Sequence, residues 1–500
     1  MKTEGPRFFT GEKYPAGHPL PESNHRCLAN ALHDTKSVSI LMAWVIEDLG
    51  TSQRKFLGHT KKHCRSSKVT MKVEVSCFIL LGLHAVVDLS SGIIHDPETN
   101  HSPINAAQYH SMPGKEHLEG AFQGALFMSN ATLKNDNFGF NLYRLIANEH
   151  DDNVFFSPLC VSFALASMLL GTKGVTRDEI LQSMDLHLLQ DKDQPNLVPT
   201  VFKRIKDLIT HNQELMIDQG NVAFIHEQFP VKESFLNMSK QYFDMEVLPV
   251  DFQNSTIAKD IVNQYIRKFT GGKIPKLYDS LDPQTKYILI NYILFKGMWL
   301  YPFNKAFTEP TPFFINKYKK IKVPMMFKAD EISSTVDKKL RCTVLKLPYR
   351  GNAAMLVVLP REEGDYGSIE DNLTGDLVQS WLAKMETRKT FLFFPKFTLD
   401  HRYEMGKLLQ ELGIQDLFSG SANFTELTDQ RNMRLSEVTQ RAMIEVNEKG
   451  TEASVVTGSE IVGHALPTTI RVERPFIFII IEELLNSILF IGRVVNPIEQ

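Results

Sequence analysis

The most constraining feature of this chain is its hydrophobic C-terminal end. Residues 476–481 and 487–495 are almost entirely apolar, and Glu482 and Glu483 mark the break between them. Short apolar runs without alternation are typical of strands that are buried on both faces. Each run is too short to span a bilayer, and the two carboxylates argue further against a membrane hairpin. We therefore expect two fully buried strands joined by a short turn.

A second element must also lie at the centre of the fold. Residues 159–171 are apolar nearly all round, which predicts a buried helix. Helices and strands are mixed without regular alternation, so the fold class is α+β rather than a doubly wound parallel sheet. Helices are expected at residues 137–148, 159–171 and 197–209, and strands at residues 153–156, 214–224, 285–295, 342–347, 355–359 and 391–397.

The chain divides into a long domain and an N-terminal part. No Pro/Gly/Ser-rich linker interrupts residues 135–500, which we interpret as one large domain. Residues 71–92 have the layout of a signal peptide: a methionine and a lysine, an apolar run, then small residues. A buried strand or helix is the alternative for that run. On this interpretation residues 1–70 are an extension that precedes the true start, and residues 93–134 form a flexible segment.

Two further observations concern the cysteines and the possible glycosylation sites. The cysteines form no CxxC pair and no zinc-ligand spacing, so neither a metal site nor a disulfide framework is expected. Asn-x-Ser/Thr triplets are N-glycosylation acceptors and support secretion, although chance produces several in a long chain. The candidate sites are Asn130, Asn237, Asn254, Asn372 and Asn423, while Asn100 is the poorest because Pro103 follows its triplet.

The sequence offers no catalytic site. The net charge of −3 supplies no broad positive field for nucleic acid. The sequence contains no GxSxG, HExxH, GxxxxGK[ST] or GxGxxG motif, and its histidines are scattered. We therefore predict that the protein is not an enzyme.

Residues 445–467 are unusual because they are long, poor in bulky side chains, and flanked by stretches that look ordered. An irregular segment of this length inside a compact domain needs a reason. Alternate residues from Thr451 to Ile461 are small or β-branched and uncharged, while Glu452 and Glu460 fall in the other set. As a strand in a sheet, the segment could bury one face without burying a charge. An ordinary flexible loop is the alternative.

The run Glu448-Lys-Gly-Thr-Glu-Ala453 resembles the hinge of a serpin, and the resemblance extends over about residues 135–500. It implies three β-sheets, about nine helices and an exposed reactive loop at 448–467. Other matching motifs are Phe156-Ser-Pro158, Thr270-Gly-Gly-Lys-Ile274, Asn291-Tyr-Ile-Leu-Phe-Lys-Gly-Met-Trp299, Val323-Pro-Met-Met326, Arg474-Pro-Phe476 and Asn496-Pro497.

The resemblance also implies a mechanism and its residues. A serpin is a suicide substrate: the protease cleaves the loop, and the loop inserts into a β-sheet while the acyl-enzyme persists. The implied scissile bond joins His464 and Ala465, and the implied hinge residues are Glu448, Gly450, Thr451, Glu452 and Ala453. A non-inhibitory serpin acting as a carrier or chaperone is the alternative, but its hinge tends to carry bulky, charged or proline residues.

Within the family, Lys346-Leu-Pro-Tyr349 and Ser459-Glu-Ile461 resemble a branch that acts in blood coagulation. This implies factor Xa or factor XIa as the target and a Gla-bearing cofactor protein, protein Z, that contacts Tyr318, Asp371, Lys317 and Asp151. Heparin or another glycosaminoglycan is an expected activator through charge pairing, although a solvated helix face is the alternative. The basic residues concerned are Lys192, Lys203, Arg204 and Lys206.

Overall fold

The computed structural model describes residues 115–189, 196–210, 212, 214–362, 366–449 and 467–499, with the backbone alone for residues 115–131 and 188. The chain divides into two compact units, Met1–Ala125 and Leu126–Gln500, and the fold below is that of the second. The expected extension at 1–70 and signal peptide at 71–92 lie outside the described residues.

Nine α-helices occur in the described part of the chain, as expected. Three short 3-10 helices accompany them. Helix α6 is buried along its whole length, which confirms that it belongs at the centre. The helices are α5 (Lys115–Glu149), α6 (Pro158–Met168), α7 (Gly174–Ser183), α8 (Leu197–Thr210), α9 (Glu233–Phe243), α10 (Ser255–Phe269), α11 (Tyr366–Asn372), α12 (Gly375–Ala383) and α13 (Met405–Glu411).

A five-stranded sheet has the order β10-β11-β4-β2-β3. Its central strands β4 and β11 run parallel to each other, while β4 is antiparallel to β2 and β11 to β10. Since β4 is buried at every residue, other parts of the protein pack against both faces of this sheet. The strands are β2 (Ile217–His226), β3 (Glu246–Val250), β4 (Tyr287–Phe295), β10 (Phe397–Glu404) and β11 (Glu437–Val446).

A nine-stranded sheet has the order β1-β14-β13-β8-β7-β6-β9-β12, with β5 also paired to β6. The family resemblance implied three sheets, whereas the strands form two hydrogen-bonded sheets. The long strand β6 joins what would otherwise be two sheets, because it pairs with β7 at its C-terminal end and with β5 and β9 elsewhere. The strands are β1 (Val154–Phe156), β5 (Glu309–Asn316), β6 (Lys319–Asp337), β7 (Cys342–Pro348), β8 (Ala353–Pro360), β9 (Glu386–Pro395), β12 (Thr468–Arg471), β13 (Phe476–Glu482) and β14 (Ser487–Val494).

The predicted C-terminal hairpin is confirmed. Strands β13 and β14 are antiparallel neighbours, and every residue of both is buried. Strand β8 pairs with the other edge of β13, and β1 with the other edge of β14. The hairpin is therefore interior on both edges as well as on both faces.

Two boundaries differ from the sequence expectation. Helix α5 begins at Lys115, so residues 115–134 are helical rather than part of a flexible segment. Pro113 and Gly114 precede it, and no proline follows until the helix has ended, so no proline interrupts it. The strand expected at 391–397 was wrong at its end, because β9 stops at Pro395 and β10 starts at Phe397 in a different sheet. A continuous apolar pattern does not reveal a change of sheet.

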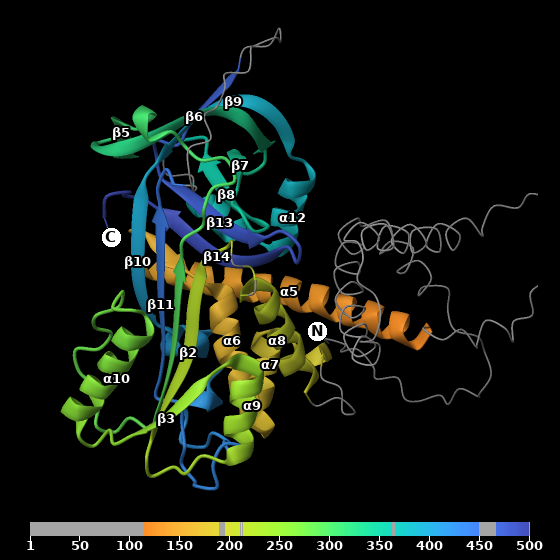
Figure 1. The fold of residues 1–500 in the computed structure, drawn as a ribbon, viewed down its shortest axis with the longest axis vertical. Coiled ribbons are helices and arrows are strands. Elements are labelled where there is room, and N and C mark those ends of the chain that lie inside the picture. Colours follow the sequence, from red (N-terminus) through yellow and green to blue (C-terminus); the bar gives the residue numbers. More distant parts are fainter. Residues whose placement is uncertain are drawn as a thin grey trace, which may run out of the picture. The chain divides into compact units, whose positions relative to one another are not determined.

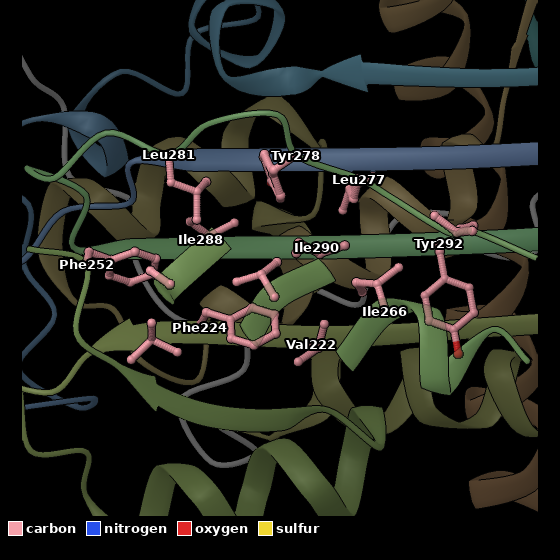
Figure 2. Close-up of a cluster of buried hydrophobic side chains, with 14 residues drawn as sticks. Val222, Phe224, Phe252, Ile266, Leu277, Tyr278, Leu281, Ile288, Ile290 and Tyr292 are labelled. Carbon is pink, nitrogen blue, oxygen red and sulfur yellow. The ribbon is translucent and has the colours of Figure 1, made fainter. Parts of the chain in front are cut away.

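Helix α10 covers one face of the five-stranded sheet, and α6 packs against the other face (Figure 1). The residues under α10 form one hydrophobic cluster, in which side chains from β2 and β4 point toward the helix (Figure 2). Helix α10 contributes one face to this cluster through residues spaced four apart, which is the helical period. These are Ala258, Val262 and Ile266.

We predict that Ile266→Ala lowers the free energy of unfolding by about 2–5 kcal/mol, because it leaves a cavity in this cluster. Ile261 on the same helix is 42% exposed, whereas Ile266 is 0% exposed. Ile261→Ala removes the same atoms and is expected to change stability far less. Urea unfolding of both variants measures the difference, and equal losses would contradict the assignment of this face to the core.

Candidate functional site

The candidate site is the seam between β4 and β11, together with the segment that leaves β11. The chain leaves the five-stranded sheet at Val446 and enters the nine-stranded sheet at Thr468. The residues between these points are those that the sequence singled out. Most of them lie outside the described residues: the hinge residues Gly450, Thr451, Glu452 and Ala453, and the implied bond between His464 and Ala465.

The seam is a parallel pair at the centre of the sheet. Its register runs from Glu437 opposite Ile288 to Ile444 opposite Phe295. Parallel pairing is slightly less stable per residue than antiparallel pairing. A strand that entered between β4 and β11 from the top of β11 would be antiparallel to both. It would replace one parallel ladder with two antiparallel ladders, so the arrangement favours insertion.

Glu448 anchors the segment where it leaves β11. Its carboxylate accepts a hydrogen bond from Thr308 Oγ1 at 2.8 Å and forms an ion pair with Lys396 Nζ at 2.8 Å. Its side chain is only 9% exposed, so both oxygens depend on these partners. Glu448 is the one predicted hinge residue within the described residues.

Aromatic packing also holds the backbone at the place where the segment leaves β11. Trp299 Nε1 donates a hydrogen bond to the carbonyl oxygen of Asn447 at 2.9 Å. The Trp299 ring stacks on the ring of Tyr349, with ring centroids 4.2 Å apart and an angle of 9° between the ring planes. Because Trp299 is buried, this donor is fixed in position and holds the backbone just before Glu448.

The charge on Glu448 is stabilised in the folded protein. Burial by itself would raise the pKa of this carboxyl, but hydrogen bonds from Lys396, its own backbone N–H and Thr308 outweigh burial and lower the pKa. The anchor is therefore ionised at neutral pH. It stabilises the fold at and above the unfolded pKa and loses that effect as the pH falls through the folded pKa.

A second set of contacts holds the seam from the α6 side. Gln440 on β11 lies opposite Asn291 on β4 in the register. Gln440 Nε2 donates to Ser157 O at 2.9 Å and to Asn291 Oδ1 at 3.4 Å, and Ser157 N donates to Gln440 Oε1 at 3.0 Å. Ser157 is the N-cap of α6, and its hydroxyl donates to Leu489 O at 2.7 Å. These buried groups are uncharged and tie both strands to α6.

A third set holds the seam from the α10 side. The segment between α10 and β4 crosses toward β11, where Tyr278 OH lies 2.8 Å from Thr439 Oγ1. Arg441 Nη1 donates to Lys276 O at 3.0 Å. The same segment is tied back to α10, since Asn263 Nδ2 donates to Tyr278 O at 2.8 Å. Opening of the seam must stretch this connection.

Two of the four basic residues expected to bind glycosaminoglycan form ion pairs, and the role of the cluster stays a prediction. Lys192 lies outside the described residues. Lys203 forms an ion pair with Asp207 at 3.2 Å, and Lys206, whose side chain is 7% exposed, pairs with Asp244. Helix α8 therefore offers less free positive charge than its sequence suggests. Arg204 lies between these two lysines on the same helix.

The residues expected to contact a cofactor protein are on the surface. Tyr318 is 87% exposed, and the Lys317 ammonium lies 4.8 Å from the centre of its ring. Asp371 is exposed near the end of α11 and interacts electrostatically with Arg144, while Asp151 is exposed after α5. The role of these residues as cofactor contacts stays a prediction.

The candidate glycosylation sites are open to solvent where they can be assessed. Asn237, Asn254 and Asn372 are exposed, Asn423 is half-buried, and the side chain of Asn130 is not described. Glycosylation stays a prediction. Among the described residues no group of His, Cys, Asp and Glu has the arrangement of a metal site, and Cys160 and Cys342 are buried free thiols. No helix in the described ranges is long and apolar enough to cross a membrane.

Sequence reasoning missed several residues of this site. Lys396, Thr308 and Gln440 carry no local signal, because each is an ordinary polar residue: the first two lie beside strand ends and Gln440 lies within β11. Their role comes from partners more than 50 residues away, which pattern analysis cannot pair. Asn291 was included in a quoted motif, but only the tertiary structure places it opposite Gln440.

Comparison with known proteins assigns the family. The model of the family "Serpin (serine protease inhibitor)" matches residues 133–497. The chain therefore belongs to the serpin family. This confirms the predicted fold class and agrees with a site built on a loop beside a parallel seam.

The chain is also similar to particular members of this family. The chain is 50% identical over 371 residues to protein Z-dependent protease inhibitor of Mus musculus, covering 74% of this chain and 82% of the relative. The crystal structure of the mouse inhibitor matches with a TM-score of 0.70 and 48% identity, covering 74% of this chain and 99% of that one. Corticosteroid-binding globulin of Ovis aries is 34% identical over 367 residues, covering 73% and 85% respectively.

We predict that Gln440→Ala lowers the free energy of unfolding by about 1–3 kcal/mol, because it leaves buried Ser157 and Asn291 groups without a partner. Gln410 is exposed on α13, and Gln410→Ala is the matched control. Thermal and urea unfolding measure both variants. Unchanged stability of Gln440→Ala would show that these contacts do not hold the seam.

We predict that Glu448→Gln destabilises the protein at pH 7 by about 1–2 kcal/mol, since a partly buried ion pair is broken. The pKa of Glu448 is depressed in the folded protein, so the difference from the wild type should shrink as the pH falls below about 4. Unfolding midpoints between pH 3 and pH 7 measure it, with Glu411→Gln as the exposed control. A pH-independent difference would argue against the ion pair.

Proposed function

We propose that this protein is a secreted suicide-substrate inhibitor of a serine protease. The observation that carries the proposal is the parallel seam of β4 and β11, with the predicted reactive loop leaving the top of β11 at Glu448. Membership of the serpin family supports it. The protein's own residues need perform no catalysis, because the protease supplies the chemistry.

In the proposed reaction, the serine hydroxyl of the protease attacks the carbonyl carbon of His464. The peptide bond to Ala465 breaks, and the protease's general acid protonates the leaving amine. An ester then joins His464 to the protease. Trapping requires that the loop inserts before water hydrolyses this ester.

The energetics of insertion follow from the seam. An inserted strand exchanges one parallel ladder for two antiparallel ladders, and this gain opposes the loss of the Glu448 contacts and of the Gln440 contacts. About fourteen residues at roughly 3.3 Å each give about 45 Å of new strand, which displaces the attached protease far from its docking position. A displacement of that size can distort the protease active site.

The proposed targets are coagulation proteases, factor Xa or factor XIa, and the proposed cofactor is protein Z. The similarity to relatives named protein Z-dependent protease inhibitor supports this. The proposed cofactor contacts are Tyr318, Lys317, Asp371 and Asp151, of which Tyr318 is the most exposed. Residue His464 sets the fit to the protease pocket, and histidine suits neither a pocket for arginine or lysine nor one built for a large aromatic ring.

The carrier alternative is supported by the 34% identity to corticosteroid-binding globulin and the 34% identity to thyroxine-binding globulin. The hinge composition opposes it. Residues 451–456 are small or β-branched apart from Glu452, so they can enter a sheet. An inhibitor and a carrier differ in whether a stable complex with the protease forms, which the following experiment measures.

We predict that incubation with factor Xa, factor XIa or chymotrypsin gives a complex that survives boiling in detergent. The paired test uses Ala453→Glu, which places a charge on the face expected to be buried, and Ser454→Glu, which places it on the other face. The first should raise the stoichiometry of inhibition about tenfold or more, and the second should change it about twofold or less, because burying an unpaired charge is costly.

Gel electrophoresis and titration of residual protease activity measure the outcome. Cleavage after His464 without any stable complex in the wild-type protein would refute the inhibitor proposal. Equal effects of the two glutamate variants would refute the alternation of buried and exposed residues in the loop.

A further inference from the structure

Strand β10 carries a histidine whose ring is enclosed and lacks one hydrogen-bond partner. The strand forms one edge of the five-stranded sheet, beside β11 (Figure 1). Within the described residues, the Nε2 atom of His401 is buried and has no hydrogen-bond partner. A buried polar group without a partner costs free energy, so its presence needs an explanation. His401 is also only one strand away from the seam between β4 and β11.

The His401 ring belongs to an aromatic cluster. It stacks on the ring of Tyr403, two residues further along β10, with ring centroids 5.9 Å apart and an angle of 9° between the planes. The ring of His150, which follows α5, meets the same tyrosine edge-on with centroids 5.7 Å apart. Tyr403 itself is 6% exposed. Two imidazoles from different segments therefore pack against one buried tyrosine.

The segment that carries His150 is held in place from β14. Arg493 Nε donates a hydrogen bond to the backbone oxygen of Asp152 at 3.2 Å, and Arg493 Nη1 forms an ion pair with Glu370 at 3.0 Å. Because the Arg493 side chain is 3% exposed and bound at both ends, it fixes the backbone beside the cluster. A charge that forms on His401 would meet groups with fixed positions.

Charged and titratable groups surround His401 and Tyr403 on several elements. Asp400 on β10 is engaged by Arg441 of β11 through two hydrogen bonds of 2.8 Å. Asp152 Oδ1 lies 3.8 Å from His150 Nδ1. In the described part of the chain neither carboxylate forms an ion pair with His401. The groups that act on the two rings are Asp400, His150, Asp152 and Arg493, while the residue opposite His401 on β11 is Ala442.

The His401 ring is neutral at neutral pH. Burial lowers the pKa of His401, and His150 lowers it further, whereas Asp152 and Asp400 raise it. The net shift of the pKa is downward, because burial is the largest effect. The folded protein therefore resists a proton at this position.

Tyr403 connects the cluster to the contacts that hold the seam from the α6 side. It lies directly opposite Gln440 in the antiparallel register of β10 and β11. The side chains of such a pair lie on the same face, with Cβ atoms about 4.5–5.5 Å apart. Tyr403 OH also accepts a hydrogen bond from the backbone N–H of Phe155 at 3.3 Å, two residues before Ser157. A displacement of Tyr403 would reach both Gln440 and Ser157.

We propose that His401 makes the five-stranded sheet sensitive to acid: a proton on its enclosed ring loosens β10 and weakens the Gln440 contacts that hold the seam. The added charge has no partner at Nε2, so it gains hydration only if β10 moves outward, and Tyr403 moves with the strand. This regulation goes beyond the proposed inhibition of a protease and does not require it.

The pH range follows from the direction of the pKa shift. In the unfolded chain a histidine has a pKa of about 6.5, so the unfolded chain takes up this proton before the folded protein does. The stabilisation that neutral His401 provides is complete above about pH 6.5. It is lost as the pH falls below that value, until the lowered pKa of the folded protein is reached.

The test compares the full-length wild-type protein with His401→Gln, which is similar in size and cannot take up a proton. Amide hydrogen exchange of β1, β10 and β11 is measured by mass spectrometry at about pH 7.5 and about pH 5, on either side of the unfolded pKa. The proteins are compared at the same pH, so that the intrinsic pH dependence of exchange cancels. The matched control is His187→Gln, because the His187 side chain is 52% exposed and lies 3.6 Å from Asp185.

At the higher pH we expect wild type and His401→Gln to exchange alike. At the lower pH the wild type should exchange about threefold to tenfold faster in these strands, since a pKa shift of one unit is a tenfold change in an equilibrium constant. His187→Gln should match the wild type at both values. A measurement that needs no variant is exchange of the imidazole C2 proton, which should give His401 a titration midpoint below about 6.5.

Three results would overturn the proposal: an equal effect of acid on wild type and His401→Gln, a His401 midpoint at or above about 6.5, or acid-induced exchange confined to segments other than β1, β10 and β11. The failure of this proposal is separable from failure of the inhibitor proposal, because none of these measurements uses a protease. At neutral pH, His401→Gln should form the detergent-stable protease complex as the wild type does.

Discussion

The parallel pairing of β4 and β11 is the interaction on which the rest of this structure depends. It occupies the centre of a sheet covered by α6 on one face and α10 on the other. A central parallel ladder is a weak point, because each of its strands would gain from an antiparallel neighbour. The fold therefore keeps a sheet that can accept another strand, and it places the candidate loop at the end of β11.

Three groups of contacts keep that seam closed, and they differ in chemistry. At the top, Glu448 is held by a charged partner and a hydroxyl, so its contribution depends on pH. Toward α6, Gln440 is held by neutral hydrogen bonds, which do not titrate. Toward α10, Tyr278 and Lys276 connect the covering segment to β11. On the proposed mechanism, these several modest contacts keep the seam closed until the loop is cleaved.

Local sequence patterns predicted much of the architecture, and the predictions that were wrong or incomplete have physical causes. The buried C-terminal hairpin and helix α6 were predictable, because continuous apolar runs leave no alternative to burial. The boundary at Lys396 was missed, since a chain can change sheets without changing its apolar pattern. The ion pair between Lys206 on α8 and Asp244 was also missed, because Asp244 is 38 residues away along the chain.

The sequence by itself determined which segments are buried, which hinge composition can enter a sheet, and where positive charge accumulates. Those properties depend on residue type and spacing, which are local. Only the tertiary structure decided that Gln440 faces Asn291 across the seam and that Glu448 meets Lys396. Such pairings join residues far apart in the chain, and their energy depends on geometry that no local period encodes.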